Sequence, residues 1–100
     1  MADARRLRGL RYGAGFPDTL EHRRIDPGTD RAKALAAAIR RLRSAERLPL
    51  NGDAEIEIWG AQRFWAHAFA SRLWLYYVTD PSGLDEYVLL MAVHDYLHEQ

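Results

Sequence analysis

Apolar residues in the C-terminal half of the chain predict two strands joined by a tight turn. Residues 72–78 are rich in aromatic and β-branched side chains, which suit a half-buried pleated surface. Residues 87–93 are apolar on both alternating faces, which is typical of a strand inside a sheet that is covered on both sides. Between them, Asp80-Pro81-Ser82-Gly83 has turn chemistry, because Pro81 fixes its own φ and Gly83 accepts a positive φ. We therefore predict a β-hairpin.

Two segments before this hairpin also have strand patterns. Asn51-Gly52 is a strong turn signal, and residues 55–58 then alternate glutamate with isoleucine, so this strand should expose one acidic face. Residues 61–71 fit two periods, since their aromatic residues alternate as in a strand but their alanines and spacing also suit a helix. We favour the strand, because strand signals lie on both sides, and predict a strand meander over residues 54–94.

A helix is predicted over residues 30–47. Asp30 is a suitable N-cap, and the residues that follow are mainly alanine, leucine and arginine, which favour helices. Pro49 should end the helix, because the residue before a proline avoids helical backbone. The apolar face, expected to pack on the sheet, contains Leu35, Ala38, Ile39 and Leu42. The opposite face, here called the basic stripe, either binds an anionic partner or is simply solvated, and it contains Lys33, Arg40, Arg43 and Arg47.

The segment before this helix is less regular. Residues 1–12 contain four arginines with apolar residues between them, which predicts either a first strand or a basic arm. Glycine and proline in residues 13–19 should prevent a regular element, and residues 20–25 fit a short strand or a helical turn. No linker or repeat divides the chain. The whole pattern predicts one α+β domain, residues 1–100, with one main helix packed on a largely antiparallel four- to five-stranded sheet.

Composition limits the class of protein. The 100 residues are 48% hydrophobic, which is enough to bury a core, and they include no cysteine, so we expect no disulfide. No apolar run reaches the roughly 18 residues that a membrane helix requires, and the N-terminus lacks the apolar run of a signal peptide. We therefore expect a folded cytoplasmic protein that does not enter a membrane.

Charge is distributed unevenly although the net charge is zero. Residues 1–50 hold twelve Lys and Arg against six Asp and Glu, whereas residues 51–100 hold two against eight, so the halves carry net charges of +6 and −6. This asymmetry favours an anionic partner for the first half, such as nucleic acid or an acidic protein. Mutual attraction of the two halves within one fold explains it equally well.

Histidine, tyrosine and arginine near the predicted strands could carry chemistry. His94 ends the last predicted strand, and the other candidates lie on the segments around it: Arg63, His67, Arg72 and Tyr96. Histidine and tyrosine can move protons near neutral pH, and arginine can hold a phosphate with its planar guanidinium group. Such a group could cleave RNA by activating the 2′-hydroxyl, stabilising the developing charge and protonating the leaving oxygen. A histidine at a strand end can also be structural or merely solvated.

No cofactor is expected. His94 and His98 are four residues apart and could share a metal on a helix, but they stand at the end of the chain with no evident third ligand. We therefore expect no metal site.

Residues 54–96 resemble the RelE/ParE superfamily of bacterial toxins, which are of similar size and place helices before a strand meander. The motifs that carry the resemblance are Phe-Trp-Ala-His at 64–67, Arg-Leu-Trp-Leu-Tyr-Tyr-Val at 72–78, Thr-Asp at 79–80 and the apolar strand 88–94 that ends in a histidine. The resemblance implies that Arg72 lies near RNA, that His94 takes the place of a basic residue at the end of the last strand, and that Tyr96 is the terminal aromatic residue. It also implies an antitoxin partner and a target in RNA, free or on the ribosome.

The chain departs from this family in three respects. It is neutral rather than strongly basic, it has one clear helix instead of a helical hairpin, and Lys33 is its only lysine. A ParE-like toxin without ribonuclease activity would fit these departures. A non-enzymatic bacterial or phage interaction module, dimeric through an exposed edge strand, is a further hypothesis. Nucleic-acid binding by the basic stripe is a third, and it requires the stripe to continue into Arg5, Arg6 and Arg8.

Overall fold

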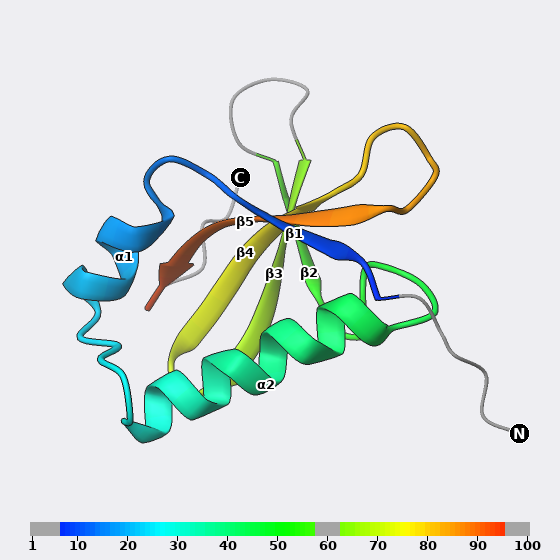
Figure 1. Ribbon diagram of the computed structural model, residues 1–100. Coiled ribbons are helices and arrows are strands. Elements are labelled where there is room, and N and C mark those ends of the chain that lie inside the picture. The colour runs from blue at the N-terminus through cyan, green and yellow to red at the C-terminus, as the bar shows by residue number, and fades with distance from the viewer. Residues whose placement is uncertain (1–6, 58–62, 96–100) are drawn as a thin grey trace, which may run out of the picture.

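A computed structural model describes residues 7–57 and 63–95 of the chain. The elements in these ranges are β1 (Gly9–Tyr12), α1 (Phe16–His22), α2 (Asp30–Ser44), β2 (Ala54–Glu57), β3 (Arg63–Ala70), β4 (Leu73–Thr79) and β5 (Tyr87–His94). The strands form one sheet in the order β1-β5-β4-β3-β2, and α2 runs across one face of it (Figure 1). No helix in the described part of the chain is both long and apolar enough to cross a membrane.

The sheet is mixed. Strands β2 to β5 form an antiparallel meander, whereas β1 pairs in parallel with β5, with Leu10 opposite Val88. The predicted α+β fold with a largely antiparallel sheet is therefore confirmed. β1 also shows that residues 9–12 form a strand, and β3 shows that residues 63–70 are strand rather than helix.

The prediction of a single main helix is only partly right, because α1 precedes α2. Gly15 is the N-cap of α1, and Pro17 occupies its first turn, where a proline costs no hydrogen bond. Phe16 is buried in the core, and the Thr19 hydroxyl accepts a hydrogen bond of 3.1 Å from the Val93 backbone N–H. Thus the glycine and proline that were expected to prevent an element mark the start of one instead.

The ends of α2 differ from those predicted. Thr29, not Asp30, is the N-cap, and its side chain accepts a hydrogen bond of 3.2 Å from the Ala32 N–H. The helix ends at Ser44, five residues before Pro49, because Ala45 is already extended. The predicted apolar face is confirmed, since Leu35, Ala38 and Leu42 are buried and Ile39 packs beside them.

Two irregularities in the sheet redirect side chains. The β3–β4 register shifts between Ala68 and Ala70, and the β4–β5 register shifts at Met91. An extra residue reverses the alternation beyond it, so Leu90 and Val93 both reach the core under the helices although their spacing is odd. Met91 packs against the separate cluster on the other side of the sheet, which contains Ile56, Ala66 and Tyr76. The last strand is apolar on both faces because a hydrophobic cluster packs on each side of it.

The predicted turn at Asp80–Gly83 is present, but the connection between β4 and β5 continues to Glu86 and is longer than the tight turn that was predicted. Gly83 has φ of 83°, and the Asp80 carboxylate accepts hydrogen bonds of 3.0 Å from Glu86 N and 2.9 Å from Ser82 N. These bonds, the one to Glu86 first, hold the pKa of Asp80 below its usual value. Asp80 therefore organises this loop as a carboxylate.

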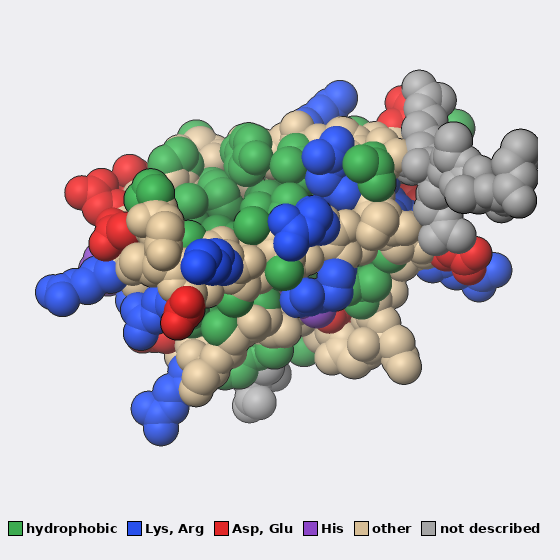
Figure 2. Space-filling model, turned by 60° about the horizontal axis from the view of Figure 1, so that its bottom comes forward, with side chains coloured by type: hydrophobic (Ala, Val, Ile, Leu, Met, Phe, Trp, Pro, Cys, Tyr) green, Lys and Arg blue, Asp and Glu red, His purple; other side chains and the backbone are tan. Residues whose placement is uncertain are grey.

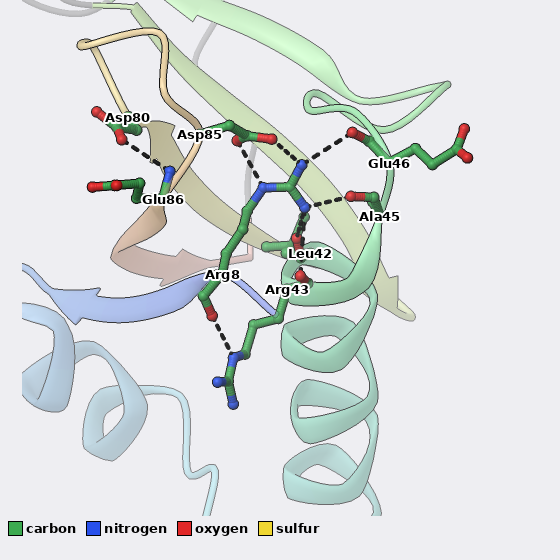
Figure 3. Close-up of polar contacts among 8 residues, drawn as sticks. All are labelled: Arg8, Leu42, Arg43, Ala45, Glu46, Asp80, Asp85 and Glu86. Atoms are coloured by element: carbon green, nitrogen blue, oxygen red, sulfur yellow. Dashed lines mark hydrogen bonds and ion pairs between the residues drawn. The ribbon is translucent and has the colours of Figure 1, made fainter. Parts of the chain in front are cut away.

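Arg8 joins three distant segments (Figure 3). It is 5% exposed, and its guanidinium group donates to the carbonyl oxygens of Leu42 at 2.9 Å and Ala45 at 2.5 Å, where α2 ends. The same group makes a two-point contact with the Asp85 carboxylate, with 2.7 Å between Nε and Oδ1. Arg43 also contacts Arg8, because the Arg43 Nε donates a hydrogen bond of 2.8 Å to the Arg8 backbone carbonyl. The last carbonyl groups of a helix have no hydrogen-bond partners within the helix. The Arg8 guanidinium group donates these hydrogen bonds at the end of α2.

Candidate functional site

A basic cleft opens at the end of the sheet where β3 turns into β4. Its volume is about 750 Å³. The cationic side chains that line it come from the end of α1, the start of α2 and the β3–β4 turn, and they are Arg23, Arg24, Arg31 and Arg72, together with His22. Asp30 and Asp95 are the acidic residues in its lining. We call this site the arginine cleft.

The backbone at two of these arginines is left-handed. Arg24 has φ of 55° and Arg72 has φ of 59°. Residues other than glycine pay roughly 1 kcal/mol or more for this conformation, which persists only where the surrounding structure enforces it. Arg24 follows α1, where the Arg24 N–H donates to Glu21 O and the Ile25 N–H donates to Leu20 O, as in a helix end that usually carries glycine. Both turns therefore fix where an arginine side chain leaves the backbone.

The positive charge of the cleft is only partly compensated. Arg23 Nη2 lies 3.3 Å from Asp95 Oδ1, while its Nε is buried and has no hydrogen-bond partner among the described residues. Arg31 Nη1 donates to the Arg23 carbonyl at 2.9 Å. Within the described ranges, no ion pair or side-chain hydrogen bond engages the guanidinium groups of Arg24 and Arg72. Such a set of guanidinium groups suits an anion with several oxygens, such as a phosphate.

A smaller pocket adjoins the arginine cleft. It has a volume of about 250 Å³ and shares His22 and Arg23 with the cleft. His94 lines this pocket, and its ring packs edge-on against Tyr76 with 4.6 Å between ring centroids. Two histidines on different elements thus line one small pocket beside four arginines. Imidazole is the side chain best suited to exchange protons near neutral pH.

The predicted site residues fall into separate groups. Arg72 and His94 lie at the same end of the sheet, although Arg72 is in the β3–β4 turn rather than at the start of the predicted strand. Arg63 is at the opposite end of β3, 69% exposed, with its Nη1 atom 3.2 Å from Glu55 Oε2. His67 lies in the middle of β3 and binds Asp53. Tyr96 lies outside the described residues. The structure therefore does not bring Arg63 and His67 to Arg72.

His67 belongs to a second polar cluster, under the loop that follows α2. Its Nδ1 is 2.8 Å from Asp53 Oδ1, and Arg41 Nη2 is 3.2 Å from its Nε2. Because arginine can only donate, Nε2 accepts and Nδ1 carries the proton that is donated to Asp53. The Asp53 side chain is 3% exposed and also accepts from the Tyr77 hydroxyl and, at 3.2 Å, from Leu50 N.

Tyr77 remains a phenol in this cluster. Burial is the main cause that raises its pKa, and the hydrogen bond to the Asp53 carboxylate adds to it, because both disfavour a second negative charge. The buried carboxylate therefore has a stable set of donors from the loop and from two strands. This arrangement anchors residues 45–53 on the sheet, so we assign the cluster to the fold.

The basic stripe of α2 is interrupted. Figure 2 shows basic side chains separated by hydrophobic and neutral ones on the face that carries α2. Lys33, Arg40 and Arg47 are exposed, but Arg43 turns toward the Arg8 carbonyl. Arg8 itself is buried and therefore cannot extend a surface stripe, which is a correction to the hypothesis of nucleic-acid binding by this face. Arg5 and Arg6 lie outside the described residues.

Most residues of the arginine cleft were missed by the sequence analysis. The run His22-Arg23-Arg24 is visible in the sequence, but the helix that ends there was not predicted, so its direction was unknown. In addition, Arg23 and Asp95 meet only through the tertiary fold. A dense cationic run between glycine-rich segments is the signal that could have identified them.

No group of three or more His, Asp or Glu residues in the described ranges is placed to hold a metal ion. In comparisons with known proteins, no protein-family model matches the chain and no curated protein sequence matches it.

Proposed function

We propose that the protein is a RelE/ParE-like toxin of a toxin–antitoxin pair, that it acts in the cytoplasm on RNA, and that the arginine cleft is its site. The observation that carries this proposal is the gathering of Arg72 with three further arginines and His22 in one cleft at the end of the sheet, with His94 in the smaller pocket beside it. RNA is a polyanion, and guanidinium groups bind its phosphates. Its 2′-hydroxyl is an internal nucleophile, so cleavage requires only proton transfer and charge stabilisation.

The order of elements supports the same family. Helices that precede a strand meander are the arrangement by which the chain resembles these toxins, and α1 supplies the second helix that the sequence pattern lacked. The chain has no net charge, but its charges are distributed unevenly over the surface. Cations gather at the cleft, while acidic side chains such as Glu55 and Glu86 lie elsewhere.

An interaction module is the second candidate, and a specific surface favours it. β1 is an edge strand, and the large hydrophobic side chains near it, Leu7, Tyr12 and Leu84, are more than half exposed. A pocket of about 670 Å³ lies beside β1 and the β4–β5 loop. An edge strand with exposed apolar residues suits pairing with an extended segment, from an antitoxin or from a second copy of the chain.

Induced expression in a bacterial host tests the toxin. We expect the wild type to arrest growth and an Arg72→Ala, His94→Ala double variant at equal soluble level to lose this effect completely, because one change lies in the cleft and the other in the pocket beside it. An Arg63→Ala, Arg47→Ala variant removes two exposed cations elsewhere and should arrest growth like the wild type. Arrest by all three proteins would indicate a ParE-like toxin that acts on a protein target. Absence of arrest by the wild type would favour the interaction module.

A further inference from the structure

The outer edge of β1 leaves backbone groups free at Leu10 and Tyr12. β1 pairs in parallel with β5, and the N–H groups of Gly9 and Gly13 donate to carbonyl oxygens on that side, both at 2.8 Å. In a parallel ladder, successive residues alternate between bonding the neighbouring strand and facing away from it. The N–H and C=O groups of Leu10 and Tyr12 therefore face outward, and no backbone hydrogen bond from the described residues outside β1 and β5 engages them.

The last turn of α2 closes this edge just before Leu10 and gives it a basic border. The Arg8 N–H donates to the Arg43 carbonyl at 3.1 Å, and the Arg43 Nε donates to the Arg8 carbonyl at 2.8 Å (Figure 3). Arg43 thus takes, at Arg8, the place of a neighbouring strand. Arg40 is exposed and lies one turn earlier on the same side of α2. Within the described ranges, neither arginine forms an ion pair with an acidic side chain.

The opposite side of the edge is apolar and has no net charge. Leu7 and Leu84 are 53% and 70% exposed, and both line the pocket of about 670 Å³ beside β1. Gly9 lines the same pocket and contributes no side chain to fill it. The charged side chains in the lining are two of each sign, and they are Arg8, Arg11, Asp85 and Glu86. The edge therefore has a basic side at α2 and an apolar side at this pocket.

We propose that the free edge of β1 binds an extended segment of a partner protein in which acidic residues alternate with apolar ones. Successive side chains of an added strand point to opposite faces of the sheet, so one set faces Arg40 and Arg43 and the other faces Leu7 and Leu84. Carboxylates match the first pair, and apolar side chains match the second. This inference rests on the interaction module proposed above and adds the chemistry of its partner.

A second copy of the chain fits this edge less well. Two β1 strands that paired about a two-fold axis through the free groups of Leu10 and Tyr12 would place Arg11 directly opposite its own copy. Arg11 is exposed, and like charges directly opposite each other destabilise a strand pair. The other edge strand of the sheet, β2, offers the acidic Glu55, but Glu55 already pairs with Arg63. Charge complementarity therefore favours a segment of a different protein.

The test selects binders to the folded full-length protein from a display library of random peptides of about ten residues, the length of a long strand. We expect the enriched peptides to alternate acidic and apolar residues. Arg40→Glu reverses one bordering charge and should weaken their binding roughly 10-fold, by less as salt is raised. Tyr12→Pro removes an outward N–H, which an edge strand tolerates, and should weaken binding as much. Arg63→Glu, an exposed change on β3, should keep the affinity of the wild type.

Amide hydrogen exchange locates the bound peptide. The amides of Gly9 and Gly13 should be protected with and without the peptide, because they are bonded on the β5 side. The amides of Leu10 and Tyr12 should become protected only in the complex. Thermal melting of each variant shows that a loss of binding is not a loss of folding.

Three results contradict the proposal in distinguishable ways. If the enriched peptides protect Leu10 and Tyr12 but are neutral or basic, the acidic chemistry is wrong and the interaction surface stands. If no peptide is enriched, or the enriched peptides leave both amides unprotected, the interaction module fails at this edge. If both amides are protected without peptide in a species whose mass rises with protein concentration, the occupant is a second copy. None of these results bears on the arginine cleft, whose lining contains no residue of β1.

Discussion

Replacement of Arg8 by methionine should lower the free energy of unfolding by about 2–4 kcal/mol. Methionine fills much of the volume but donates no hydrogen bond, so the carbonyl oxygens at the end of α2 and the Asp85 carboxylate lose their common partner. For a domain of this size the melting temperature should fall by roughly 10–20 °C. Urea unfolding followed by circular dichroism measures the change directly.

Arg47→Met is the matched control for Arg8, because Arg47 is exposed just beyond α2. Its effect should stay within about 0.5 kcal/mol. Arg8→Lys should fall between the two variants, since an ammonium group keeps the charge but cannot reach several carbonyls and a carboxylate at once. If Arg8→Met unfolds at the same urea concentration as Arg47→Met, the contacts of Arg8 do not stabilise the fold.

Asp53→Ala should also lower the free energy of unfolding by about 2–4 kcal/mol. The change leaves the Tyr77 hydroxyl, the His67 ring N–H and the Leu50 N–H without the carboxylate that accepts from all of them. Tyr77 is fully buried and has no access to water in exchange. Thermal and urea unfolding should report the loss.

Glu55→Ala tests whether this effect depends on burial. Glu55 also pairs with a cation, Arg63, but both side chains are largely exposed, and exposed pairs contribute about 0–1 kcal/mol.

A double variant Asp53→Ala, Tyr77→Phe should lose less free energy of unfolding than the sum of the losses in its two single variants, because the second change removes the unsatisfied hydroxyl. Additive effects would mean that Asp53 and Tyr77 do not act together.

The sequence was a good guide to the elements that have regular patterns. The turn at Asp80–Gly83, the meander of β2 to β5 and the apolar face of α2 could all be predicted, because each depends on local periodicity or turn chemistry. The helix α1 could not, because its glycine and proline were expected to prevent an element although they stand at its start, and because the burial of Phe16 and the bond from Val93 to Thr19 are tertiary contacts.

The candidate site was less accessible to sequence reasoning. Arg72 and His94 were singled out and lie at the same end of the sheet, but His22 and Arg23 reach them only through the packing of α1 beside β5. For Arg8, the sequence suggested a binding role that the structure does not support. In the sequence it belongs to a run of arginines that suggests a binding surface, whereas in the fold it is buried and satisfied by α2. Sequence spacing does not distinguish an arginine that binds a partner from one that caps a helix.

The most direct test of the arginine cleft is to titrate 15N-labelled protein with a single-stranded RNA oligonucleotide and follow the backbone amide signals by NMR. The account predicts that the largest chemical-shift changes fall on residues 22–24, 30–31, 71–72 and 94–95, and that they weaken as salt is raised. The basic stripe should change little. Changes confined to Lys33, Arg40 and Arg47, or no changes at saturating RNA, would contradict the assignment of the cleft as the RNA site.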